Sequence, residues 1–173
     1  RDSSTSRGLG DVYKRQPLQA TNEDINRFMI QNKKWFEIHL AKAQAREKAK
    51  EGIHKLTQDE IVALANRALE VIPERVAHYA PLVGVTYGRI TIRRQKSRWG
   101  SCSSKGNLNF NCLLMLTPPE VIDSVVVHEL CHRKEMNHSD KFYAEVLRVF
   151  PMYWEQDKWL KENGDILMTM LGE

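Results

Sequence analysis

The stretch TPPEVIDSVVVHELCH, residues 117–132, decides the fold. It opens with Thr117, which can cap a helix, followed by prolines suited to a first turn and by Glu120, which can close a capping box. The residues that follow are apolar on most faces of a helix, as is typical of a helix buried in a core. These features predict a buried helix that runs from Pro118 to about Met136.

The same helix carries an HExxH motif, His128-Glu129-Leu130-Cys131-His132. Two histidines four residues apart lie one turn apart on one helix face, so their imidazoles can converge on one metal ion. Glu129 lies on the flank of that face, close enough to touch a metal-bound water without becoming a ligand. The motif therefore predicts a hydrolase in which zinc activates a water and Glu129, as general base, takes its proton during attack on a peptide carbonyl.

A catalytic zinc site needs a third protein ligand and one open position. His138 lies six residues after His132, and Asn137 tolerates the left-handed conformation that would end the helix and turn the chain back. Glu135 is a rival, because it lies on the same stripe of the helix and can either bind the metal or orient His132 through its carboxylate. We expect His138 as the ligand and Glu135 as the orienting group, around one zinc ion, although imidazole also suits cobalt and iron.

Two further helices are predicted ahead of this stretch. Thr21 and Thr57 each stand three residues before an acidic side chain, which is the pattern of a capping box, and apolar residues follow at helical spacing. The second of these helices is expected to end near Pro73 or to run on to Pro81.

Residues 83–116 are rich in strand-forming residues and turn signals, and they predict about three antiparallel strands. Ser139 can cap a helix that ends before Pro151, and a shorter helix is expected from about Met152 to Glu162. Together these elements predict an α+β fold in which a small antiparallel sheet packs on the metal-binding helix, with helices flanking it.

The domain organisation is expected to be simple. Residues 1–16 (RDSSTSRGLGDVYKRQ) have no helix or strand period and are interpreted as a non-native or disordered leader. Residues 17–80 are expected to form an N-terminal helical segment, and residues 81–173 the metal-binding core, within one domain.

The three cysteines, Cys102, Cys112 and Cys131, form no CxxC pair. This odd count argues against a disulfide framework and against a cysteine zinc site, and it favours a reducing, cytoplasmic location. We expect the cysteines to be small buried apolar residues. No apolar run approaches the roughly 18 residues of a membrane span, so no membrane partner is expected.

The stretch from Arg98 to Cys102 has two interpretations. It can be an edge strand beside the cleft, onto which a substrate adds as a further strand, with Arg98 and Trp99 contacting the substrate. It can equally be a tight turn in which Trp99 belongs to the core and Gly100 serves the backbone.

A basic run, together with the net charge of +4, keeps a second class of function open. The run comprises Arg89, Arg93, Arg94, Lys96 and Arg98. It fits a nucleic-acid-associated module with a structural zinc, or simply a solvated strand face.

The sequence also resembles the YgjP-like metallopeptidase family and, more distantly, the WLM and SprT-like proteases. The segments that carry the likeness are KSRWGSCSSKG (96–106), PPEVID (118–123), VVVHELCH (125–132) and KEMNHS (134–139). The resemblance covers about residues 17–159. It implies a zincin-like fold with a His-His-His zinc site that cleaves peptide or protein substrates.

Overall fold

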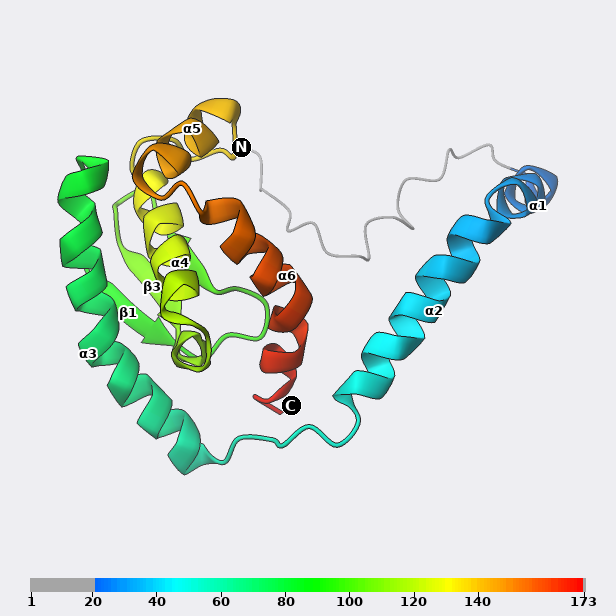
Figure 1. The fold of residues 1–173 in the computed structure, drawn as a ribbon, viewed down its shortest axis with the longest axis horizontal. Helices are drawn as coiled ribbons and strands as arrows, with labels where there is room; N and C mark the ends of the chain where they lie inside the picture. Colours follow the sequence, from blue (N-terminus) through cyan, green and yellow to red (C-terminus); the bar gives the residue numbers. More distant parts are fainter. Residues whose placement is uncertain (1–20, 173) are drawn as a thin grey trace. The chain divides into compact units, whose positions relative to one another are not determined.

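The computed structural model describes residues 21–172, so the predicted leader at residues 1–16 lies outside the described residues. Figure 1 shows the course of the chain. The elements, in order, are α1 (Asn22–Gln31), α2 (Lys33–Lys50), α3 (Gln58–Val83), β1 (Ile90–Arg93), β2 (Gly100–Cys102), β3 (Leu108–Asn111), the 3-10 helix η2 (Cys112–Leu116), α4 (Pro119–Cys131), α5 (Asp140–Val149) and α6 (Tyr153–Thr169). The prediction of an α+β fold with a small three-stranded sheet is confirmed.

Contacts within the chain divide it into two units, and the boundary in the sequence falls between Lys48 and Ala49. In the first unit the predicted capping box of Thr21 is present, and α1 follows it. None of the described side chains in α1 or α2 is buried, and the unit's aromatic rings pair with one another instead. The predicted grouping of residues 17–80 with residues 81–173 in one domain stays a prediction.

Helix α4 is the centre of the second unit. Figure 1 shows it between α3 and α6, with the sheet on one side, and it also contacts α5 and β2. Because α4 is covered on several faces, most of its side chains are buried, as its apolar sequence predicts. The core around it includes Ile72, Phe110 and Phe142, which pack with its own Val126 and Leu130.

Helix α3 begins at the predicted capping box of Thr57 and Glu60. It continues through Pro73 and Pro81 and ends at Val83, so the shorter of the two predicted ends is wrong. Its buried stripe of apolar side chains spans both prolines, and this packing outweighs the hydrogen bonds that the prolines remove.

The sheet has the strand order β1-β3-β2. Strands β2 and β3 form the predicted antiparallel pair, with Gly100 opposite Phe110. The antiparallel prediction is wrong for β1, which runs parallel to β3 with Ile90 opposite Leu108. The chain reverses between β1 and β2 and again between β2 and β3. The first and third strands therefore run the same way, and they become neighbours because β3 lies in the middle.

Helix α4 differs from its prediction at both ends. The hydroxyl of Thr117 donates to the carbonyl of Leu114 at 2.8 Å instead of capping α4, which has no side-chain cap. The helix ends at Cys131, well before Met136, because Lys134 N–H bonds to the carbonyl of Cys131 in a tightened turn. Among the described residues only glycines have positive φ, so the expected left-handed turn at Asn137 is also wrong.

The last two helices follow the sequence pattern closely at their starts. Ser139 caps α5, whose last residue precedes Pro151, as predicted. Helix α6 starts at Tyr153 but continues to Thr169, beyond the predicted end at Glu162. No helix within residues 21–172 has both the length and the apolar character that crossing a bilayer demands. The cytoplasmic location stays a prediction.

Replacing Thr57 by alanine should destabilise the second unit, because it removes the side-chain acceptor for the Glu60 N–H at the start of α3. We expect the free energy of unfolding, measured by urea denaturation, to fall by about 1 kcal/mol. Thr21→Ala is the matched control, since it removes the same capping box from α1, a helix without buried side chains. An equal loss in both variants would contradict the prediction.

Candidate metal centre and active site

The three histidines predicted to bind a metal lie together. His128 is on α4, His132 directly follows its last residue, and His138 lies in the connection to α5. Nε2 of His128 is 3.2 Å from Nε2 of His132 and 3.0 Å from Nε2 of His138. Within residues 21–172 these three form a group of histidine, cysteine or acidic residues suited to a metal ion, with ligand atoms within 4.8 Å of one another.

The separations of these nitrogens suit a single small ion. Two nitrogens bound to one tetrahedral zinc at roughly 2.0–2.1 Å lie about 3.3 Å apart. The Nε2 atoms of these histidines lie at similar distances, 3.0 and 3.2 Å. Burial lowers the pKa of His128 to about 3, and the charges of His132 and His138 add to the effect. Burial also lowers the pKa of His132. Neutral imidazoles with free lone pairs are the form that metals bind.

In two of the rings, a hydrogen bond to Nδ1 orients the imidazole so that Nε2 faces the other histidines. Nδ1 of His128 lies 2.9 Å from the hydroxyl of Tyr153, and Nδ1 of His132 lies 3.1 Å from the carbonyl oxygen of Glu135. The buried ring of Phe142 packs against all three imidazoles, with centroid distances of 4.6–4.9 Å. The sequence analysis gave neither Tyr153 nor Phe142 a role at the site, because neither lies within the HExxH segment.

Glu135 takes the predicted place beside His132, but through a different atom. The expectation was a carboxylate that orients the ring, whereas the contact is made by the main-chain carbonyl. The carboxylate is also outside the metal-binding group found among the described residues. The tight turn after Cys131 explains the change, because it folds the backbone of residue 135 back over His132.

Glu129 lies beside the histidines and against strand β2. The residue is only 5% exposed, and a Cβ atom added at Gly100 would come within 2.6 Å of its Oε1. Gly100 is therefore required for the close approach of α4 to the strand. Burial raises the pKa of Glu129 to about 8, while the charge of Arg98 acts in the opposite direction.

A pocket of about 270 Å³ opens next to Glu129 and His128. Its walls come from the residues before β2, from α4 and from α6. Arg98 and Trp99, the predicted substrate-contacting residues, both line it. Both interpretations of their stretch hold in part: Gly100–Cys102 is an edge strand, while Trp99 packs on the core and against Gly164 of α6.

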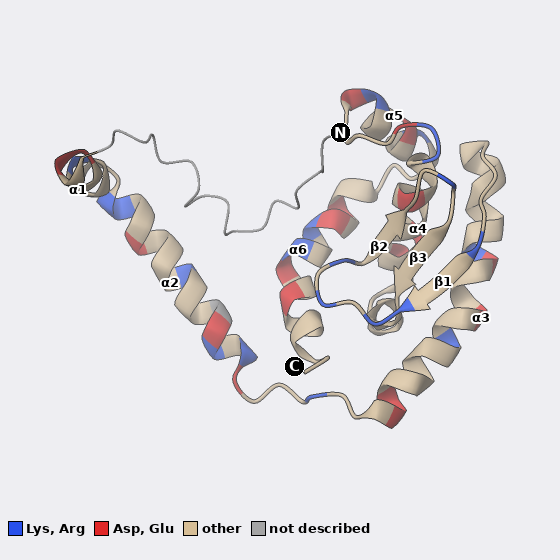
Figure 2. Cartoon of the chain, turned by 180° about the vertical axis from the view of Figure 1, so that it is seen from behind, with Lys and Arg blue, Asp and Glu red and all other residues tan. Residues whose placement is uncertain are grey.

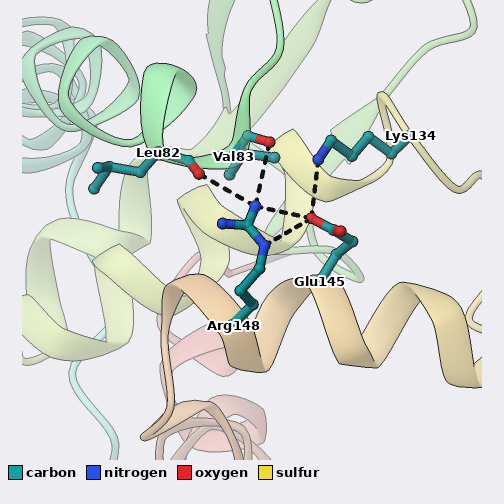
Figure 3. Close-up of polar contacts among 5 residues, drawn as sticks. All are labelled: Leu82, Val83, Lys134, Glu145 and Arg148. Atoms are coloured by element: carbon teal, nitrogen blue, oxygen red, sulfur yellow. Dashed lines mark hydrogen bonds and ion pairs between the residues drawn. The ribbon is translucent and has the colours of Figure 1, made fainter.

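The segment that bears His138 is braced at both ends. Figure 3 shows Glu145 of α5 accepting from Lys134 at 3.0 Å and from Arg148 at 2.9 Å. Arg148 also donates to the carbonyl oxygens of Leu82 and Val83 at the end of α3. Hydrogen bonds from Arg148 and Lys134 lower the pKa of Glu145. Since Ser139 caps α5, the connection from residue 134 to residue 139 is held to α3 and α5 together.

The cysteines and the basic run lie outside the metal-binding group. Cys112 and Cys131 are buried as expected, Cys102 is half-buried, and all three are free. Figure 2 shows lysines and arginines along β1 and the connection to β2. Two of them make internal contacts, because Arg94 donates to the carbonyl of Leu171 and Arg93 to the side chain of Asn109. Nucleic acid as a partner stays a prediction.

A buried HExxH helix with a third histidine and a neighbouring carboxylate is an arrangement typical of metallopeptidases. The model of the YgjP-like metallopeptidase domain matches residues 49–163, and the chain belongs to this family. It is thus an enzyme whose substrates are peptides or proteins. A comparison with curated proteins found no match.

Two solved structures are similar to part of the chain. The metallopeptidase zymogen abylysin of Pyrococcus abyssi is 24% identical with a TM-score of 0.49, and the likeness covers 53% of this chain and 94% of abylysin. The metallopeptidase zymogen jannalysin of Methanocaldococcus jannaschii is 22% identical with a TM-score of 0.48, over 53% of this chain and 95% of jannalysin.

Removing the third imidazole should empty the metal site. We expect purified His138→Ala to lose most of its bound metal, measured by elemental analysis, because two ligands hold an ion far more weakly than three. Glu135→Ala should keep its metal, since its contact to His132 comes from the main chain. His78→Ala, an exposed histidine on α3, serves as the control. Full metal content in His138→Ala would exclude it as a ligand.

Proposed function

We propose that this metallopeptidase holds one zinc ion on His128, His132 and His138 and uses Glu129 as its general base. The observation that carries the proposal is the convergence of three Nε2 atoms, 3.0 and 3.2 Å apart, beside a buried carboxylate. Three imidazole ligands leave one position of a tetrahedral ion free, which is the ligand pattern of catalytic zinc. Imidazole also suits other divalent metals, so zinc is part of the proposal.

When bound, zinc would polarise the substrate carbonyl and make a water molecule more acidic. Glu129 takes the proton of the attacking water and delivers it to the leaving amine. Its buried position supports this role, because a carboxylate with a raised pKa holds a proton more readily than an exposed one. The nearby positive charge of Arg98 opposes that shift and favours the ionised form that can accept the proton.

The pocket next to Glu129 supplies a place for a substrate side chain. Its apolar lining residues include Trp99, Val125 and Leu160, and Arg98 and Asp157 also line it. Strand β2 is at the edge of the described sheet and its Gly100 lines the pocket, so a peptide can pair with the strand while one side chain enters the pocket. We infer that the pocket takes an uncharged side chain next to the cleaved bond, and that Arg98 helps to hold a substrate carbonyl.

Replacing Glu129 by glutamine should abolish peptide cleavage while the metal stays bound. The amide keeps the shape of the side chain but accepts no proton, so we expect kcat to fall by about 10²–10⁴-fold or more. Glu120→Gln, at the exposed first turn of the same helix, is the matched control and should keep full activity. Undiminished cleavage by Glu129→Gln would reject the general-base role.

Narrowing the pocket should change which substrates are cleaved. Leu160→Trp fills space next to Trp99, and we expect kcat/KM to fall by roughly 10–200-fold for peptides with a large side chain at this position. Peptides with alanine or glycine there should be affected much less. Ile166→Trp, an exposed position on the same helix, is the control. A uniform loss across all peptides would show that the pocket does not select the side chain.

A further inference from the structure

Tyr153 contacts the candidate metal centre from the side opposite the metal position. It is the first residue of α6, and only 6% of its surface is exposed. Its hydroxyl oxygen lies 2.9 Å from Nδ1 of His128, and the two rings are nearly parallel, with an interplanar angle of 19°. The contact therefore joins the start of a helix far along the chain to the first histidine of HExxH.

The chemistry of a bound imidazole fixes the direction of this hydrogen bond. A metal at the common point takes the lone pair of Nε2, so the proton of a neutral His128 lies on Nδ1. Nδ1–H then donates and the hydroxyl of Tyr153 accepts. The second ligand is held in the same way, since Nδ1 of His132 faces the carbonyl of Glu135. For His138, no hydrogen bond between Nδ1 and a described residue is present.

Burial makes the hydroxyl hard to replace. Tyr153 belongs to the main hydrophobic core, and the ring of His128 contacts both it and the ring of Phe142. Without the hydroxyl, Nδ1–H would lose this partner, and an unpaired buried donor is costly. A phenol is also neutral, so it orients the ring without adding the negative charge that a carboxylate partner would bring to the centre.

We propose that Tyr153 is a positioning residue that sets the ring orientation and the proton position of His128, and thereby the affinity of the site for its metal. The inference rests on the proposed metal centre. It also makes the correct start of α6 a condition for tight metal binding, because the tyrosine sits at that start.

The test compares Tyr153→Phe with Tyr143→Phe in the full chain. Tyr143 is the matched control: its ring stacks on His138 at 6.1 Å, but its hydroxyl makes no hydrogen bond to a described residue. The dissociation constant for zinc is measured by competition with a chromogenic chelator, and the thermal midpoint of each metal-free protein is measured alongside. We expect zinc affinity to be 10- to 100-fold weaker in Tyr153→Phe and unchanged in Tyr143→Phe.

Wild-type zinc affinity in Tyr153→Phe would overturn the inference, even if its metal-free midpoint dropped, because the tyrosine would then only pack. A wild type that binds zinc no better than His128→Ala would instead reject the metal centre itself, which separates the two failures. The ¹⁵N spectrum of the wild-type histidines gives a test that needs no variant. In the zinc-loaded protein, a His128 ring with its proton on Nε2 would contradict the proposal.

Discussion

The close contact between Glu129 and Gly100 is the constraint on which the site depends. The carboxylate side chain occupies space that any Cβ atom at position 100 would need, so helix and strand approach as nearly as a backbone allows. This contact buries the carboxylate and places the edge strand beside the histidines. The sheet is small, with strands of only three or four residues, but it defines one wall of the site.

The histidines themselves depend on a different contact, the ring of Phe142. All three imidazoles pack on this one side chain, although they come from the end of a helix and from the following connection. The ion pairs of Glu145 hold that connection from the other side, through Lys134 and Arg148 (Figure 3). The packing on Phe142 and the ion pairs of Glu145 thus act together to hold the connection between residues 134 and 139 in one conformation.

The sequence predicts what depends on local chemistry. The capping boxes at Thr21 and Thr57, the cap at Ser139 and the meeting of the two HExxH histidines all follow from spacing along a helix. What it misses depends on contacts between distant segments. No short window of residues predicts the order of the strands, the passage of α3 through two prolines or the contact of the Tyr153 hydroxyl with His128. Thr117 fails as a cap because α4 begins at Pro119, so that Pro118, which has no side-chain acceptor, stands at the N-cap position.

The pocket and the metal-binding group draw all their residues from one stretch of chain, between Ser97 and Leu160. That stretch lies wholly inside the second unit and inside the segment that defines the family. One continuous stretch of the chain therefore supplies every residue of the pocket and of the metal-binding group. Such a stretch can be joined to other sequences as one block, because the residues of the pocket and of the metal-binding group all travel with it.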